Sequence, residues 1–421
     1  MTEAVKTVAL AGAALVLAIS AAVVEPEARV PEIMSDQGQA FYPHFTDPQA
    51  PRVIEVVDYD EATATAQLLR VQFQQGKWVI SSRYNYRVDI GDRLAKTAAA
   101  LMDLKKDMVR SDSALDHPKF GVVDPLDEKA GGLAGRGKRV TLRDAHNDIL
   151  ADYILGKPVE GKPGYRYVRV PGQRRTYAVK TDADPSAHFA DWVNAGLLRI
   201  AGSSIRKVTI NRYNLDTLAG RLANMETTVL TQENGQWKST SGQKVDMNAV
   251  KAMAAALDTL KIADVRPKPP GLANSLRNET VELTLETALS LRQKGFVLTP
   301  EGRMYSSEGD MTIETNNGLV YSLRFGEVAA GDTKSGAPSD NRHLFVMVHF
   351  DKAKAATYGG DAAAGERAAK ELNDRFADWY YIISGKDFQT LRLGRAASAK
   401  APAPNPPNLP PPQAQPAAPP G

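Results

Sequence analysis

Residues 132–138 of this 421-residue chain form a glycine-rich segment whose spacing could bind phosphate. Gly132 to Lys138 fits the pattern G-x-x-x-x-G-K, in which backbone amides and the lysine hold the phosphates of a nucleotide. That pattern needs Ser or Thr at the next position to hold magnesium, and Arg139 stands there. The segment also follows the polar stretch Asp124–Lys129 rather than a hydrophobic strand. We therefore interpret it as a flexible loop and not as a nucleotide site.

Histidines and acidic residues are the next candidates, as metal ligands. The six histidines are scattered and include no H-E-x-x-H motif. His343 and His349 would share one face of a strand, but six residues at about 3.3 Å each place them roughly 20 Å apart. This separation is too large for two ligands of one metal ion. The acidic cluster Asp58–Glu61 lacks the longer ligand series and central glycine of a calcium loop.

The chain contains no cysteine, which excludes thiolate zinc sites, iron–sulfur clusters, cysteine nucleophiles and disulfides. No G-x-S-x-G motif is present either. The sequence therefore predicts no catalytic residue, no metal and no cofactor, and we expect a protein that is not an enzyme. A serine–histidine–carboxylate triad assembled in space stays open, because such triads leave no local signature.

Composition places the chain among globular proteins with more than one domain. Hydrophobic residues make up 43% and charged residues 24%, so a sizeable core can form. A length of 421 residues fits two or three domains. The net charge of +3 gives no support for nucleic-acid binding.

The N-terminal residues 7–24, TVALAGAALVLAISAAVV, contain no charge. As a helix of about 1.5 Å per residue they would reach roughly 27 Å, near the thickness of a bilayer core. We expect residues 1–25 to be a transmembrane anchor, followed by a linker at 26–50. A signal peptide cleaved near Ser20–Ala22 is the alternative. The positive-inside rule, applied to Lys6, places the bulk of the chain outside the cytoplasm, in the periplasm. The predicted location is therefore the cytoplasmic (inner) membrane, with a single pass.

The four tryptophans indicate an internal repeat. Trp78 and Trp237 each follow an alternating apolar run and a polar turn, as in a hairpin. A helix pattern begins some way after each, and four apolar positions match at a constant offset: Leu94, Ala98, Leu101 and Leu104 with Val250, Ala254, Leu257 and Leu260. The motif FADW then recurs, ending at Trp192 and Trp379. We predict a first repeat at 51–203 and a second at 204–396, and we interpret the tryptophans as core residues.

The second repeat carries an insertion that has no counterpart in the first repeat. Residues 282–294 have a helical pattern, with Val281, Leu285, Ala288 and Leu289 on one face and Gly295 as its stop. A strand pair is expected after it, at 304–307 and 311–314. The tail at 397–421 is rich in proline and alanine and cannot form a packed element, so we expect it to be disordered.

The sequence resembles the DUF4340 family of bacterial membrane-anchored proteins. The resemblance is carried by the anchor, Gly76–Trp78, the helix Ala98–Lys105, the turn Phe120–Pro125 and Tyr177–Val179. It covers most of residues 50–395. Members of the family are often associated with ABC-type export systems and gliding motility. The resemblance thus implies an accessory role beside ABC permease or ATPase subunits, and it carries over no catalytic residue.

The predicted fold class is α+β, with two tandem copies of a mainly antiparallel sheet and a packed helix, preceded by one transmembrane helix. The predicted function is that of a non-enzymatic, membrane-anchored extracytoplasmic accessory or scaffold protein, auxiliary to an ABC-type transport system. The first alternative is an extracytoplasmic binding module for cell-envelope polysaccharide or peptide, suggested by the Tyr and Arg content of Tyr165–Arg175. A hydrolase with a spatially assembled site is the second alternative.

Overall fold

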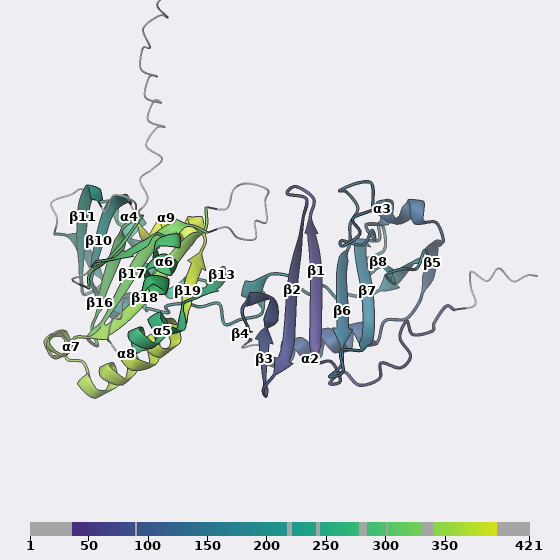
Figure 1. The fold of residues 1–421 in the computed structure, drawn as a ribbon, viewed down its shortest axis with the longest axis horizontal. Helices are drawn as coiled ribbons and strands as arrows, with labels where there is room; N and C mark the ends of the chain where they lie inside the picture. Colours follow the sequence, from purple (N-terminus) through teal and green to yellow (C-terminus); the bar gives the residue numbers. More distant parts are fainter. Residues whose placement is uncertain are drawn as a thin grey trace, which may run out of the picture. The chain divides into compact units, whose positions relative to one another are not determined.

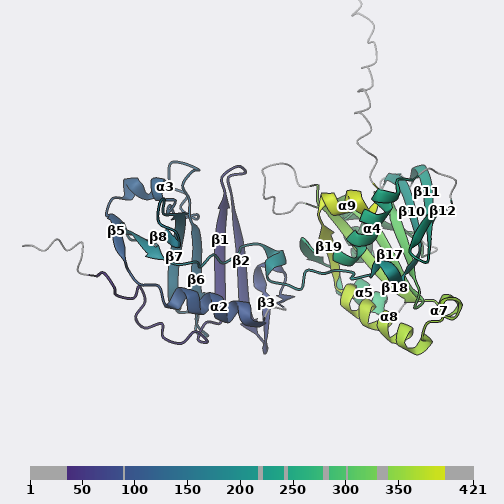
Figure 2. The same cartoon turned by 180° about the vertical axis from the view of Figure 1, so that it is seen from behind.

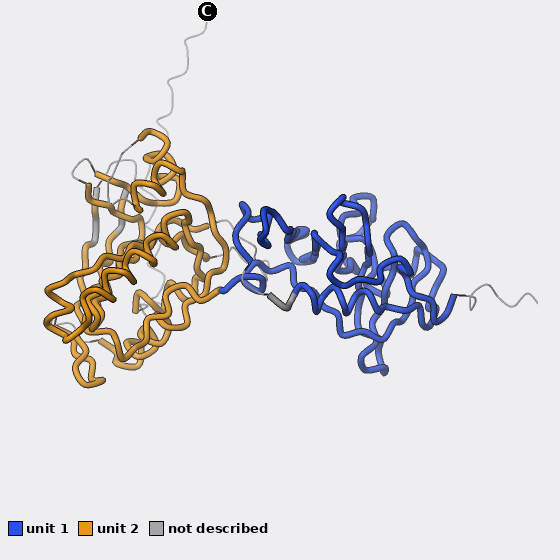
Figure 3. The backbone as a smooth tube through the Cα atoms, turned by 90° about the horizontal axis from the view of Figure 1, so that it is seen from below, with its two compact units in different colours: residues 1–194, 332–337 blue, residues 195–331, 338–421 orange. Residues whose placement is uncertain are grey.

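The computed structural model describes residues 36–88, 91–216, 221–240, 245–277, 284–299, 302–329 and 340–393. The predicted anchor at 1–25, the start of the linker and the tail at 397–421 lie outside these residues. Among the described helices, none combines the length and apolar character needed to cross a membrane. The chain divides into two compact units, with unit 1 ending at Asn194 and unit 2 beginning at Ala195 (Figure 3).

Unit 1 is built on a nine-stranded antiparallel sheet of order β4-β3-β2-β1-β6-β7-β8-β9-β5 (Figure 1). Helix α2 (Gly91–Met102) crosses one face of this sheet, as both views of the ribbon show (Figure 2). A short helix, α3 (His117–Phe120), follows β5. The strands are β1 (Val53–Asp60), β2 (Thr65–Gln74), β3 (Lys77–Ile80), β4 (Tyr86–Arg87), β5 (Met108–Ser111), β6 (Lys138–Arg143), β7 (Ile149–Pro158), β8 (Tyr165–Arg169) and β9 (Thr176–Lys180).

The described part of the expected linker packs onto unit 1. The Phe41 ring lies edge-on to Tyr153 and Tyr177, with centroids 5.6 and 5.2 Å away. The Tyr177 hydroxyl donates a 2.5 Å hydrogen bond to Asp36 Oδ2. Residues 36–50 are therefore part of the folded unit rather than a free connection.

Unit 2 is built on an eight-stranded antiparallel sheet of order β12-β11-β10-β16-β17-β18-β19-β13. If β1, β2, β3, β5 and β6–β9 are matched in chain order with β10, β11, β12, β13 and β16–β19, the two sheets have the same strand order. The strands are β10 (Ile205–Asp216), β11 (Arg221–Glu233), β12 (Gln236–Ser239), β13 (Asp264–Pro267), β16 (Asp310–Thr315), β17 (Leu319–Val328), β18 (Arg342–Phe350) and β19 (Trp379–Ile383).

The helix that follows the first hairpin also corresponds in the two units. Helix α4 (Met247–Thr259) lies between β12 and β13, as α2 lies between β4 and β5. All of the apolar positions that the sequence matched are buried, with exposed fractions between 0 and 7%: Leu94, Ala98, Leu101, Leu104, Val250, Ala254, Leu257 and Leu260. The amphipathic pattern thus identified the face of each helix that packs on its sheet.

Unit 2 contains an additional layer between β13 and β16: helices α5 (Pro270–Arg277) and α6 (Leu285–Gln293) and the hairpin β14 (Phe296–Leu298)–β15 (Met304–Ser306). This layer covers the sheet face that carries Phe345, whose ring lies 5.6 Å from Phe296. The opposite face carries Phe325, which contacts Phe388 of α9 (Gly385–Leu391) at 5.4 Å. The sheet of unit 2 is therefore covered on both faces.

One prediction for this additional layer is confirmed and one was wrong. The helix predicted at 282–294 is α6, which ends before Gly295; it packs through Thr287 and Leu291, whereas Leu285 and Leu289 are 76% and 50% exposed. The Thr284 hydroxyl accepts a 3.1 Å hydrogen bond from the Thr287 amide and caps the start of the helix. The segments 304–307 and 311–314 do not pair with each other, because β15 pairs with β14 while β16 joins the main sheet. Val281 lies outside the described residues.

The tryptophans mark equivalent places in the hairpins but not at FADW. Trp78 pairs with Phe73 across β2–β3, and Trp237 pairs with Gln232 across β11–β12, at the same point of corresponding hairpins. The first FADW follows β9, and Trp192 is 1% exposed. The second spans the end of α8 (Ala362–Ala377) and the start of β19, so Trp379 does not occupy the place that Trp192 has in unit 1. The reason is that α7 (Lys352–Tyr358) and α8 are inserted before the last strand of unit 2.

Candidate binding groove

The glycine-rich loop and the acidic cluster that stand out in the sequence contact each other in unit 1. The Gly135 amide donates a 2.8 Å hydrogen bond to Glu61 Oε1, and the Arg136 guanidinium lies 4.7 Å above the Tyr59 ring. Lys138 Nζ lies 3.7 Å from Asp58 Oδ2. The loop leads into strand β6 and not into a helix, so it lacks the helix start that a phosphate site needs. Its charges and at least one of its amides hold the acidic turn instead.

Unit 1 also contains a charge network around Arg139, in which the Asp152 carboxylate is buried and Arg139 and Asp124 are half-buried. The Arg139 guanidinium donates to Asp152 Oδ2 at 2.7 Å and to Asp124 Oδ2 at 3.0 Å. The Thr141 hydroxyl donates to Asp152 Oδ1 at 3.1 Å. The hydrogen bonds to Asp152 are the main cause that raises the pKa of Arg139. The residue that fills the serine or threonine position of a phosphate loop is therefore a structural cation.

The histidines do not form a metal site in the part of the chain that the structure describes, where no three His, Asp or Glu side chains are grouped to hold an ion. His343 and His349 both lie on β18, as expected, but in different surroundings. His343 is 6% exposed, and burial, followed by the charges of Lys294 and Arg266, lowers its pKa to about 4. His349 is exposed and lines a pocket.

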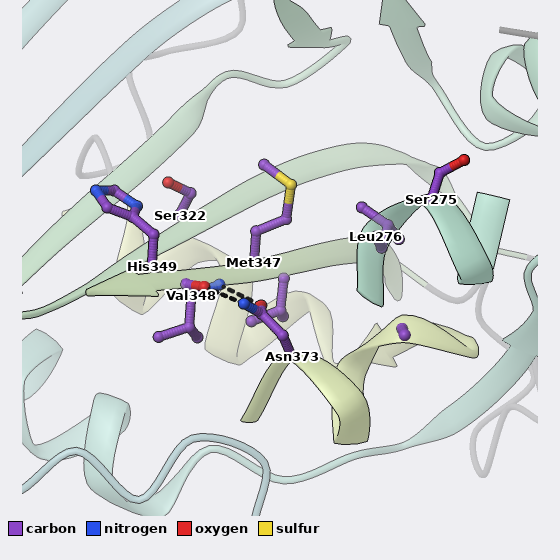
Figure 4. A pocket seen from close by; sticks show the side chains of 9 residues that line it. Ser275, Leu276, Ser322, Met347, Val348, His349 and Asn373 are labelled. Carbon is purple, nitrogen blue, oxygen red and sulfur yellow. Dashed lines mark hydrogen bonds between the residues drawn. The ribbon is translucent and has the colours of Figure 1, made fainter. Parts of the chain in front are cut away.

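That pocket, of about 210 Å³, lies in unit 2 at the side of β18. Its floor is formed by β17 and β18, from which Ser322, Met347 and His349 project on one side, and α5 forms a wall with Leu276 (Figure 4). A second pocket of about 380 Å³ continues from it, because Ser275, Leu276 and Met347 line both. We call the two together the α5–β18 groove.

At the outer edge of β18, a helix side chain replaces a neighbouring strand. Strand β19 pairs with β18 only as far as Leu344. Beyond that point Asn373 of α8 accepts a 2.9 Å hydrogen bond from the Val348 amide and donates its own amide to the Val348 carbonyl (Figure 4). The asparagine amide thus bonds to the strand as the peptide group of another strand would. It closes the groove on the side of α8.

The far end of the groove carries charge. Arg324 of β17 and Arg303 of the β14–β15 hairpin line it together with Asp310 of β16. The Asp310 carboxylate is already bonded by the Tyr213 hydroxyl at 2.7 Å and by the Asn211 amide at 2.8 Å. Arg324 Nη1 is 3.8 Å from this carboxylate, beyond hydrogen-bond distance, and its buried Nε has no hydrogen-bond partner. The middle of the groove is apolar, formed by Leu272, Leu276, Leu298, Met304 and Met347.

A buried lysine lies beneath the additional layer. Lys268 Nζ donates a 2.8 Å hydrogen bond to the Phe376 carbonyl in the last turn of α8, and it lies 4.1 Å from the Phe345 ring centroid. Burial lowers the pKa of Lys268 to about 7, against the opposing effect of the Asp378 charge. The lysine is enclosed by the core and does not reach the groove, so we assign it a role in closing the end of α8.

Comparison with known families agrees with the resemblance seen in the sequence. Residues 78–275 match the family model described as Domain of unknown function (DUF4340). The chain carries a DUF4340 domain. The matched region begins at Trp78 in unit 1 and ends at Ser275 in α5, so it includes parts of both units and the part of α5 that carries Leu272 and Ser275. Neither a curated protein nor a solved structure matches the chain.

Most of the groove was not visible in the sequence. Its lining residues come from elements spread over residues 272–377, including positions beyond the matched DUF4340 region. Of these lining residues, only His349 was considered a functional candidate from the sequence, namely as a metal ligand. Asn373 gave one weak signal, since asparagine is unfavourable inside a helix unless its side chain bonds to something.

Proposed function

We propose that this protein is a non-enzymatic, membrane-anchored extracytoplasmic accessory protein that works by binding, in association with an ABC-type transport system. The α5–β18 groove carries the binding part of this proposal, because it has a mainly apolar lining with a few polar groups at its ends. The apolar residues 7–24 support the anchor. The association with a transport system is what the resemblance to the DUF4340 family implies.

The correspondence of strand orders supports a further part of the proposal, that the two units are copies of one ancestral α+β unit. Unit 2 would have gained the layer α5, α6, β14 and β15, together with α7 and α8. Unit 1 would represent the copy without these additions. Since this added material forms most of the groove, the binding role belongs to unit 2 in this proposal.

Cross-linking in native membranes tests the transporter association. The full chain with a C-terminal tag is purified after cross-linking, and its partners and its own intact mass are determined by mass spectrometry. Recovery of ABC permease or ATPase subunits with a chain that retains residues 1–22 is expected. A cleaved chain without any membrane partner would refute both the anchor and the association.

The alternative is an extracytoplasmic module that binds envelope polysaccharide or peptide. The segment that suggested it is occupied by contacts inside unit 1: Arg166 donates to the Gly156 and Ala183 carbonyls, and Arg175 to Asp112. In this alternative the ligand would bind in the α5–β18 groove instead. A glycan and peptide array that gives no binding to the full chain would remove it.

A further inference from the structure

The charge and shape of the α5–β18 groove indicate which kind of molecule fits it. One end holds two guanidinium groups, of Arg324 and Arg303, against the single carboxylate of Asp310. That carboxylate already accepts hydrogen bonds from Tyr213 and Asn211. Among the residues that the structure describes, no carboxylate lies within salt-bridge distance of Arg303. The end of the groove thus has a net positive charge and unused guanidinium donors, which match a carboxylate or phosphate.

The apolar middle of the groove lacks the groups that a peptide would need. A bound peptide presents one donor and one acceptor per residue, which must find partners when water is excluded. The Val348 amide and carbonyl, at the edge of β18, are already bonded to Asn373. The walls between this point and Arg324 are formed chiefly by Leu276, Leu298 and Met347. An aliphatic chain needs no hydrogen-bond partners and fits these walls better.

The size of the groove agrees with a single chain. Its two pockets, of about 210 and 380 Å³, meet at Leu276 and Met347. Together they fall near the middle of the range of roughly 300–1,000 Å³ that is usual for small-molecule sites. The two pockets lie on either side of this meeting point, so a chain whose head lies at Arg324 would extend past Met347 toward Val348.

We propose that the α5–β18 groove binds an amphiphile with one aliphatic chain and an anionic head, the head at Arg324 and Arg303 and the chain along Leu276 and Met347. This inference deepens the proposed binding role of unit 2 and rests on it, but it does not depend on the transporter. A carboxylate and a phosphate head are both compatible with guanidinium recognition, and the experiment below distinguishes them.

The test uses the full chain in nanodiscs of a zwitterionic lipid, with empty nanodiscs as background. Binding of dodecanoate, dodecyl phosphate, dodecanol and dodecyltrimethylammonium is measured by equilibrium dialysis of labelled compounds. Both anions are expected to bind at least tenfold more tightly than the alcohol and the cation. The tighter of the two anions identifies the head group. Decanoate should bind about 15-fold more weakly than dodecanoate, since each buried methylene contributes about fourfold.

Three variants locate the site. Arg324→Gln should weaken dodecanoate binding about tenfold or more and leave dodecanol unchanged. Leu276→Trp should fill the meeting point of the two pockets and abolish binding of all four compounds. Arg292→Gln is the matched control, because Arg292 is exposed on α6 and does not line the groove. Circular dichroism checks that each variant is folded, and Arg324→Gln keeps the test decisive if Leu276→Trp does not fold.

Equal binding of anionic, neutral and cationic compounds would overturn the proposal, and so would equal effects of Arg324→Gln and Arg292→Gln. Saturable binding of apolar peptides without any binding of dodecanoate would also overturn it. The cross-linking experiment is scored separately. Loss of amphiphile binding in Leu276→Trp with unchanged cross-linking would support the ligand site whatever the identity of the membrane partner.

Discussion

Replacing the buried Lys268 by methionine should change how the stability of unit 2 depends on pH. The pKa of this lysine falls from 10.5 to about 7 on folding, chiefly because of burial. Between these two values the unfolded chain holds the proton and the folded chain does not, so the free energy of unfolding rises with pH. The full shift corresponds to about 5 kcal/mol at about 1.36 kcal/mol per pH unit. Between about pH 7 and pH 9 the expected rise is about 2 kcal/mol.

The measurement is urea unfolding of the full chain at about pH 7, 8 and 9, in which the unfolding of unit 2 is monitored by hydrogen exchange in its peptides. Lys268→Met should lack the rise of about 2 kcal/mol that the unaltered protein shows. The substitution also removes the hydrogen bond to the Phe376 carbonyl, but this loss does not depend on pH, so the slope and not the offset is compared. Lys251→Met, on the exposed side of α4, is the control and should retain the rise.

Parallel pH profiles for the unaltered protein and Lys268→Met would refute this reasoning. Such a result would mean that Lys268 remains an ammonium group in the folded protein up to pH 9. Three interactions could hold it charged: the carbonyl end of α8, the aromatic ring of Phe345 and the charge of Asp378. The balance between burial and these interactions is what the experiment measures.

Three further substitutions test contacts described above, each by thermal unfolding. Asn373→Asp should cost about 1–3 kcal/mol at pH 7, because the introduced carboxylate faces the carbonyl to which the amide donates; the loss should shrink as pH falls and the carboxyl is protonated. Gly135→Ala should lower the free energy of unfolding by more than about 1 kcal/mol, because Gly135 has a φ of +79° and an added Cβ would lie 2.4 Å from a backbone oxygen. Gly132→Ala is the control: an added Cβ would meet nothing within 4 Å, so stability should change by less than about 0.5 kcal/mol. Arg139→Met should cost about 3 kcal/mol, because it leaves the Asp152 carboxylate buried without its cation.

The sequence predicted those features that repeat locally or follow a helical period. The stripes of α2 and α4 and the hairpin positions of Trp78 and Trp237 are local patterns, and the structure confirms them. The α+β class with antiparallel sheets followed from them. The FADW motif misled because an identical four-residue sequence can occur on either side of a final strand.

Features that depend on distant contacts were out of reach. Gly135 and Glu61 were both singled out in the sequence, but their hydrogen bond joins positions 74 residues apart. The sequence placed Leu285 and Leu289 on one face of α6, but both are exposed, and the buried side is the one where Leu291 packs against the neighbouring hairpin. The α5–β18 groove depends on the same long-range arrangement of α5, α8 and β18.

The ends of the two large sheets have a consequence for solubility. The outermost strands, β4 and β5 in unit 1 and β12 and β13 in unit 2, are only two to four residues long. Where the longer β18 extends past its neighbour β19, the Asn373 amide occupies the exposed backbone. Long unpaired edges are the usual starting points for association between sheets of different molecules. At β4, β5, β12, β13 and the end of β18, the sheets of this protein thus offer little backbone on which another copy could grow.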